Sequence, residues 1–252
     1  MKSNRRGKLV EELPFNHGIE LSVVIPIFNE VTNIHPLWCE LTQVMEELGR
    51  EYEILIIDDG STDGSYEKLS EIQRKFPVLR IIKFQKNCGM SAAFAAGFRQ
   101  AQGKYIITMD GDLQNDPHDI PALLSYTDLF DTVIGWRYQR KDSVWKKGQS
   151  KIANGIRRMV LKDNIQDVGC SLKIMKRMDL LKLPVFAGYH RFLPILLQAE
   201  GCTIKQIKVN HRPRLEGQSK YGMFNRIYKS FIDMWKVKRI IKSKENGEGN
   251  TA

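Results

Sequence analysis

Short runs of consecutive apolar residues alternate, over the first half of the chain, with segments in which apolar residues recur every three or four positions. The runs have the length of buried strands, and the longer segments have the spacing of amphipathic helices. We predict strands at residues 22–28, 52–57, 79–84, 105–109 and 132–135, and helices at 34–48, about 63–75 and 90–102. This alternation predicts βαβ units around a mostly parallel central sheet flanked by helices, an α/β fold.

The second half of the chain carries a weaker pattern. A basic loop is predicted at 139–151, then a helix ending near Leu161, a strand at 169–175, a helix at 189–200 and an alternating strand at 203–209. The stretch 211–222 is too rich in Arg, Gly and Pro for a regular element. We therefore expect a mobile basic leader at 1–20, one domain at 21–221, and a basic amphipathic helix and tail at 222–252.

The C-terminal segment combines apolar and basic residues at helical spacing. Its apolar face is predicted to hold Phe224, Ile227, Tyr228, Phe231, Ile232 and Trp235, surrounded by Arg226, Lys229, Lys236, Lys238, Arg239 and Lys242. Such a helix can lie in the interface of an anionic membrane, or it can pack on the domain with the same face. The sequence leaves both alternatives open.

The composition is that of an ordinary globular protein, with 252 residues of which 42% are hydrophobic and 27% charged. No apolar run approaches the roughly 20 residues of a spanning helix, and the N-terminus lacks a secretory signal, so we expect neither membrane spanning nor export. Four scattered cysteines without a CxxC pair favour a reducing cytoplasm. The net charge of +10 favours nucleic acid, an acidic membrane surface or a phosphorylated substrate as partner.

Acidic residues follow three of the predicted strands. Asp110 and Asp112 follow the strand at 105–109, Asp58 and Asp59 follow the strand at 52–57, and Glu30 follows the first strand. Parallel strands bring their carboxyl ends to one edge of a sheet, which is where α/β sheets bind ligands. We therefore expect these carboxylates to share a site.

Each acidic cluster can be interpreted either as part of a turn or helix cap, or as a ligand-binding site. Asp110 and Asp112 can hold one Mg²⁺ or Mn²⁺ together with diphosphate oxygens, and Gln114 adds a polar group beside them. One carboxylate of the Asp58–Asp59 pair can face donor groups of a nucleobase or ribose, although the surrounding DDGSTDGS run is also turn chemistry. Asp116 is expected only to cap the helix that begins at Pro117.

Motifs of other enzyme classes are absent from the sequence. The first strand is followed by no GxGxxG, and neither a GxxxxGK[ST] loop nor a GxSxG elbow occurs. The five histidines show no metal-ligand spacing. Basic residues in loops could instead close over an anionic ligand, and these are Arg137, Lys151, Arg212, Arg214 and Lys220.

Six segments carry a resemblance to a known family. They are PIFNE at 26–30, IIDDGSTDGS at 56–65, MDGDLQNDP at 109–117, GWRY at 135–138, DVGCSLK at 167–173 and RPRLEGQSKYG at 212–222. From about Leu21 to Tyr221 the chain resembles the family 2 glycosyltransferases, and within them the polyprenyl-phosphate glycosyltransferases that act on dolichol or undecaprenyl phosphate. The resemblance implies a Rossmann-like GT-A fold, a GDP- or UDP-linked nucleotide-sugar donor and a Mg²⁺ or Mn²⁺ cofactor.

The resemblance also implies roles for individual residues. The nucleoside pocket would be formed by Pro26, Phe28, Glu30, Ile57 and Asp59. The metal and the diphosphate would be surrounded by Asp110, Gly111, Asp112 and Gln114, with Asp110, Asp112 and Gln114 as metal ligands. The donor phosphates would meet Arg137, and Arg214 and Lys220 on a closing loop. The lipid phosphate would meet Arg137 and Lys151, and the catalytic set would be Asp110, Asp112 and Arg137. Phe28 stands where many relatives have tyrosine.

The expected reaction is an inverting, metal-dependent transfer of a sugar to a polyprenyl phosphate at the cytoplasmic face of a membrane. No transmembrane pair follows the domain, so we expect a peripheral protein on an anionic surface, and a small membrane-protein partner stays open. A soluble saccharide or protein acceptor is the alternative. A nucleic-acid-binding protein is suggested only by the charge, since no aromatic-basic RNA motif occurs. An inactive nucleotide-sugar sensor is a further alternative, which the intact DGD at 110–112 disfavours.

Overall fold

The computed structural model describes residues 18–138, 154–213 and 223–248, with only the backbone at 223–231 and 245–248. Its centre is a seven-stranded sheet in the order β3-β2-β1-β4-β6-β5-β7. The strands are β1 (Leu21–Ile27), β2 (Tyr52–Asp58), β3 (Leu79–Lys83), β4 (Tyr105–Thr108), β5 (Thr132–Arg137), β6 (Lys173–Lys176) and β7 (Ile204–Val209). Only β6 runs antiparallel to its neighbours, so the predicted mostly parallel α/β sheet is confirmed.

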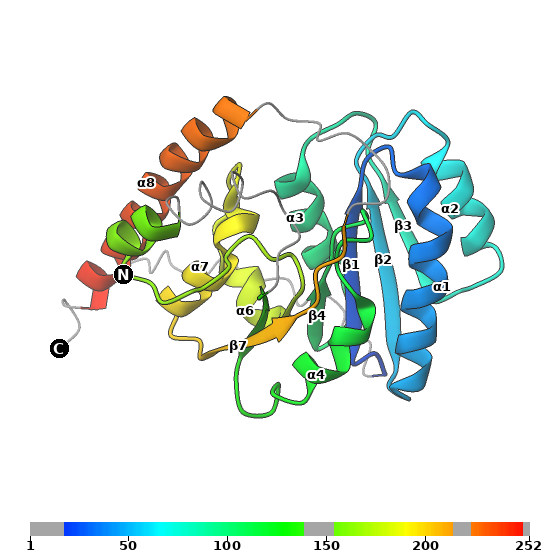
Figure 1. Ribbon diagram of the computed structural model, residues 1–252, viewed down its shortest axis with the longest axis horizontal. Helices are drawn as coiled ribbons and strands as arrows, with labels where there is room; N and C mark the ends of the chain where they lie inside the picture. Colours follow the sequence, from blue (N-terminus) through cyan, green and yellow to red (C-terminus); the bar gives the residue numbers. More distant parts are fainter. Residues whose placement is uncertain (1–17, 139–153, 214–222, 249–252) are drawn as a thin grey trace, which may run out of the picture.

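Helices cover both faces of the sheet (Figure 1). On one face lie α1 (Val31–Glu47), α2 (Ser65–Gln73), the 3₁₀ turn η1 (Pro117–Asp119) and α4 (Ile120–Leu124). On the other lie α3 (Met90–Gln100), a helical segment at 154–161, α6 (Arg177–Lys182), the 3₁₀ turn η2 (Tyr189–Phe192), α7 (Leu193–Ala199) and α8 (Met223–Glu248). Buried strand residues alternate between the two faces, as Val23 and Val24 do.

Two predicted elements differ from the structure. The strand expected at 169–175 begins only at Lys173, because the preceding residues form a turn in which the amide of Cys170 donates to the carbonyl of Asp167. The helix expected at 189–200 is divided into η2 and α7, and Pro194 lies in the first turn of α7, where the missing N–H costs nothing. The short helix α6 was not predicted.

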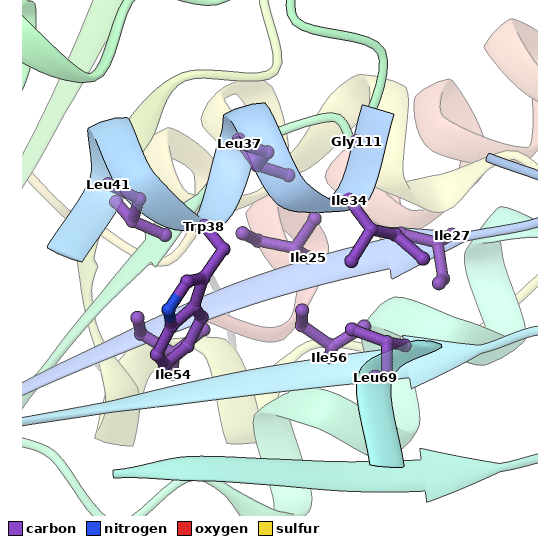
Figure 2. A pocket seen from close by; sticks show the side chains of 10 residues that line it. All are labelled: Ile25, Ile27, Ile34, Leu37, Trp38, Leu41, Ile54, Ile56, Leu69 and Gly111. Atoms are coloured by element: carbon purple, nitrogen blue, oxygen red, sulfur yellow. The ribbon is translucent and has the colours of Figure 1, made fainter. Parts of the chain in front are cut away.

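A small space lies between α1 and the sheet (Figure 2). Trp38, Leu37 and Leu41 of α1 point onto Ile25 and Ile54 of the strands. The void measures about 10 Å³, no more than a single water, and its lining is apolar. It is therefore a packing gap in the hydrophobic core rather than a ligand site.

The C-terminal helix α8 contacts the domain through residues that are not in the predicted apolar face, of which only Ile232 and Trp235 have described side chains. Met234 and Val237 are buried in the core on the α3 side. Trp235 and Ile232, which belong to the predicted apolar face, are instead 57% and 41% exposed. The helix therefore packs on the domain and also presents apolar side chains to the outside. No helix within the described residues has both the length and the apolar character needed to cross a membrane.

Candidate active site

The candidate site lies where β1, β2 and β4 end side by side. Pro26 pairs with Ile57 across the parallel strands, and the amide of Asp59 donates to the carbonyl of Ile27 at 2.9 Å. Gly111 lies against the same strand, because a Cβ at this position would stand 2.8 Å from Cγ2 of Ile27. The predicted convergence of these strand ends at one edge is thus confirmed.

The loops after β1 and β2 are held together by side chains of both loops. The backbone amide of Asn29 donates to Ser61 Oγ, and the side-chain oxygen of Asn29 accepts from the backbone amide of Thr62. Asp63 Oδ2 accepts from the amide of Val31 at the start of α1. Hydrogen bonds lower the pKa of Asp63 despite its partial burial. The turn chemistry of the DDGSTDGS run therefore builds the wall of the expected nucleoside pocket.

Glu30 lies beside this wall, at the N-terminus of α1. Its carboxylate accepts from the side-chain amide of Asn33 at 2.6 Å, and its backbone amide donates to Ser65 Oγ at 3.0 Å. Phe28 is half-buried two residues earlier. An open hollow of about 360 Å³ adjoins the wall and is lined by Gly60, Ser61, Thr62, Lys83, Phe84 and Gln85. Its size is within the range of small-ligand pockets.

Asp59 has a structural task that the sequence did not reveal. Its two carboxylate oxygens accept from the backbone amides of Cys88 at 2.7 Å and Gly89 at 2.9 Å. Burial raises the pKa of Asp59, and the two amide hydrogen bonds oppose that shift. The carboxylate therefore fixes the turn that leads into α3. Each oxygen keeps a second lone pair, so contact with a nucleobase stays a prediction.

The two carboxylates of the DGD segment lie in different environments. Asp110 is half-buried, but its Oδ1 is shielded from solvent and has no hydrogen-bond partner among the described residues. Burial, and then the charge of Asp112, raise the pKa of Asp110. Asp112 is half-buried and accepts from the amide of Gln114 at 3.2 Å. An orphaned buried oxygen beside a second carboxylate fits a divalent cation, with Asp110 and Asp112 as its protein ligands.

No three His, Cys, Asp or Glu side chains gather into a complete metal site in the part of the chain that the structure describes. Two protein carboxylates are nevertheless a common set for Mg²⁺ when a substrate diphosphate supplies the other oxygens. Gln114 contributes backbone groups here, since its amide meets Asp112 and its carbonyl accepts from the amide of Arg212. Its role as a metal ligand stays a prediction.

Asn115 fixes the DGD loop against β6. Its side-chain oxygen accepts from the amide of Asp110 at 3.2 Å and from Ser171 Oγ at 2.6 Å. Thr108 Oγ1 in turn donates to the carbonyl of Ser171 at 2.6 Å. These bonds place the loop independently of any ligand.

Arg137 pairs with Asp167 behind the DGD loop. Its guanidinium donates to both oxygens of Asp167, at 2.7 and 2.9 Å. Burial alone would lower the pKa of Arg137, but the hydrogen bonds and the negative charge of Asp167 have the larger effect. The pKa of Arg137 therefore lies above its usual value. Asp110 also contributes to that shift, which places Arg137 in the field of the DGD carboxylates. A contact with donor or lipid phosphate stays a prediction for Arg137, and the structure adds that Asp167 orients it.

Lys173 is the site residue that the sequence analysis missed. It is the first residue of β6, is 4% exposed, and donates to the carbonyl of Cys170. Burial lowers its pKa, and the negative charges of Asp110 and Asp167 oppose that effect. Asp167 and Lys173 are the ends of the DVGCSLK segment, so the signal was in the sequence. We call Asp110, Arg137, Asp167 and Lys173 the charge cluster.

The loop after β7 is anchored next to the DGD segment. Arg212 pairs with Asp116 at 2.8 Å and with Glu40 of α1 at 2.6 Å. Asp116 also accepts from the amide of His118, which confirms its predicted capping role at η1. The remaining predicted site residues, Lys151, Arg214 and Lys220, lie outside the described residues.

His190 lies in η2, in the field of Lys173 of the charge cluster. Its ring stacks on Phe94 with centroids 6.1 Å apart, and its Nδ1 is 2.8 Å from Ser91 Oγ. Burial, and then the positive charges of Arg191 and Lys173, lower the pKa of His190 to about 3. The ring is therefore neutral at physiological pH.

The His190→Asn variant is expected to lose less stability in acid than the wild type. Between pH 6.5 and 4 the imidazole of residue 190 binds a proton in the unfolded chain but stays neutral in the folded protein. The free energy of unfolding therefore falls as the pH falls. The wild-type free energy of unfolding should drop up to ~1.4 kcal/mol per pH unit more steeply than that of the variant. Urea unfolding at pH 7, 6, 5 and 4 measures this difference, and parallel curves would contradict it.

Residues 22–183 match Glycosyl transferase family 2. The chain belongs to this family. The predicted resemblance is thereby confirmed, and the protein is a member of a family of sugar-transferring enzymes.

Its relatives include polyprenyl-phosphate enzymes. It is 36% identical over 226 residues to the dodecaprenyl-phosphate galacturonate synthase of Rhizobium johnstonii, covering 87% of this chain and 67% of the relative. It is 33% identical over 210 residues to the undecaprenyl-phosphate 4-deoxy-4-formamido-L-arabinose transferase of Edwardsiella ictaluri, covering 82% and 64%. The chain thus spans about two thirds of the length of these curated relatives.

Solved structures share the fold at low sequence identity. The glucosyl-3-phosphoglycerate synthase of Mycobacterium tuberculosis, in complex with Mn²⁺ and UDP-glucose, superposes with a TM-score of 0.64 at 18% identity. The match covers 93% of this chain and 84% of that enzyme. The predicted GT-A architecture is therefore confirmed.

Proposed function

We propose that this protein transfers a sugar from a nucleotide-sugar donor to a polyprenyl phosphate, with inversion at the anomeric carbon. The observation that carries the proposal is the buried, orphaned Oδ1 of Asp110, which lies just after β4 and in the field of Asp112. The relatives named above, which act on dodecaprenyl and undecaprenyl phosphates, support this acceptor class.

The charges of the reactants and of the site residues determine the role of each residue. A lipid phosphate is already an anionic nucleophile, so the reaction needs little help from a general base. One of its oxygens attacks the anomeric carbon while the bond from that carbon to the donor diphosphate breaks on the opposite face. Arg137 and Lys173, which both lie in the field of Asp110, are proposed to balance the negative charge that gathers on the departing diphosphate. Asp167 holds the guanidinium of Arg137 in position.

A divalent cation held by Asp110 and Asp112 would supply further charge stabilisation at the diphosphate. The donor nucleoside is proposed to lie along Pro26, Phe28, Glu30, Ile57 and Asp59, and Arg214 and Lys220 are proposed to close over it. Lys151 is proposed to meet the lipid phosphate. The donor is proposed to carry UDP or GDP.

We also propose that α8 attaches the protein peripherally to an anionic membrane surface, at the cytoplasmic face. Trp235 is 57% exposed, and Lys238 stands 5.3 Å from its ring centroid. Lys236, Arg239 and Lys242 are exposed on the same helix. An exposed aromatic residue among lysines suits the boundary between headgroups and acyl chains. This placement would bring the lipid acceptor to the domain.

Exchanging Lys238→Glu is expected to weaken binding to vesicles that contain an anionic phospholipid by about fivefold or more. Each basic side chain near such a surface contributes ~1 kcal/mol, and the exchange adds a repulsive charge as well. Lys104→Glu is the matched control, because it makes the same charge change on an exposed lysine between α3 and β4. Co-sedimentation at low and high salt measures the effect, and equal losses for both variants would contradict it.

A thermal-shift screen of UDP, GDP and their sugars, each with Mn²⁺ or with EDTA, tests the donor site. A nucleotide at 100 times its dissociation constant should stabilise the protein by ~2.7 kcal/mol. A metal-dependent shift with one base supports the proposal and identifies the base. The absence of any shift would argue against a nucleotide-sugar enzyme.

A further inference from the structure

A hydrogen-bonded brace joins two parts of the chain that lie 97 and 99 positions apart. Ser91, in the first turn of α3, accepts from the amide of Gly188 at 2.8 Å, and its Oγ lies 2.8 Å from Nδ1 of His190. One arrangement satisfies the Gly188 amide, the Ser91 hydroxyl and the imidazole. In it the Ser91 hydroxyl donates to Nδ1 of His190, and the ring carries its own proton on Nε2. A neutral histidine suits this role, because a protonated ring could not accept at Nδ1.

One end of the brace reaches the proposed donor pocket. Ser91 is two residues beyond Gly89, and Gly89 begins the first turn of α3 by accepting from the amides of Ala92 and Ala93. Asp59 holds the amides of Cys88 and Gly89 from the opposite side. The start of α3 is therefore fixed between the donor-side carboxylate and the turn that contains Gly188 and His190.

The other end reaches the charge cluster and α8. The positive charge of Lys173 acts on the His190 ring, so the ring lies in the field of the cluster. Gly188 has a φ of 89° and touches Asp233 of α8 so closely that a Cβ at Gly188 would collide with its carboxylate. Arg191 pairs with the same carboxylate at 3.5 Å. The brace thus connects the start of α3 with η2, which in turn contacts α8.

We propose that Ser91 and His190 are positioning residues for the donor: their hydrogen bond holds the start of α3, and with it Asp59, in the orientation that binds the nucleotide. The inference rests on the proposed function and adds to it two residues outside the predicted site. Neither residue touches the donor in this account. Both act through the 88–89 turn and Asp59.

The test is calorimetric titration of the full chain with UDP and, in parallel, with GDP, each with Mn²⁺, followed by titration of variants with the nucleotide that binds the wild type. Ser91→Ala removes the hydroxyl, and His190→Phe keeps the stacking on Phe94 but removes Nδ1. Loss of one such bond corresponds to an affinity loss of about fivefold. The double variant should lose no more than Ser91→Ala alone, because Ser91→Ala already removes the bond to His190 together with the acceptor of the Gly188 amide.

Two conservative variants separate positioning from folding. The side-chain amide of His190→Asn can present an acceptor where Nδ1 stood and should bind like the wild type, whereas His190→Gln places its amide further out and should bind like His190→Phe. Lower melting temperatures with unchanged dissociation constants, or equal affinities for His190→Asn and His190→Gln, would overturn the inference. Failure of both nucleotides to bind the wild type would instead overturn the proposed function, and this inference with it.

Discussion

Replacing Asp112 by alanine is expected to reduce sugar transfer by ~10³-fold while the protein stays folded. The variant removes one of two carboxylates proposed to hold the cation at the diphosphate, and losing one such electrostatic contribution in a preorganised site costs ~10²–10³ in rate. Asp112 is half-buried and its Oδ1 accepts from the amide of Gln114, so its loss should affect stability far less than activity. Initial rates with saturating donor measure the effect.

The matched control is Asp128→Ala, since Asp128 is an exposed aspartate in the turn after α4. It should keep full activity and the wild-type melting temperature. A folded Asp112→Ala variant with more than a tenth of the wild-type rate would contradict the role assigned to this carboxylate. Excess Mn²⁺ should not rescue the variant if the ligand itself is missing.

Replacing Asp163 by alanine is expected to lower the free energy of unfolding by ~3–5 kcal/mol, because it leaves a buried guanidinium without its counter-charge. The side chains of Arg157 and Asp163 are only 5% and 2% exposed. Two nitrogens of Arg157 meet the two oxygens of Asp163 at 3.0 Å each, and Arg157 also donates to Asn154. The pair fixes the helical segment at 154–161 to the turn that follows it.

Asp179→Ala serves as the control for this loss. Asp179 pairs with Lys182 one turn later on α6, but that lysine side chain is 60% exposed, and such pairs contribute only ~0–1 kcal/mol. Urea unfolding followed by circular dichroism compares the two variants at pH 7. A similar small loss for both would show that the Arg157–Asp163 pair is not a structural requirement.

The first half of the fold could be predicted because each element carries its own signal. The buried run around Val24 and the periodic positions from Ile34 to Leu48 depend on local spacing alone. The elements near Lys173 and Pro194 were harder, because β6 is a four-residue strand set by pairing with β4 and β5, and α7 begins only at a proline-containing turn. Such boundaries depend on tertiary contacts that no local pattern records.

The candidate site was predictable where an acidic residue directly follows a strand, as Asp110 and Asp59 do. Its supporting partners were not, because they come from distant parts of the chain. Asp167 lies 30 positions from Arg137, and His190 lies 99 positions from Ser91. A buried lysine at the start of a strand also contradicts the usual preference of that residue for solvent, so only its place at the end of the DVGCSLK segment marked Lys173.

The most direct test of the central claim is a transfer assay with undecaprenyl phosphate as acceptor, using the nucleotide sugar selected by thermal shift. We expect a labelled sugar lipid that partitions into organic solvent, forms only with a divalent cation, and is almost lost with Asp112→Ala. Parallel reactions with 3-phosphoglycerate and with free saccharides should give no product. Transfer to a water-soluble acceptor without any sugar lipid would contradict the account.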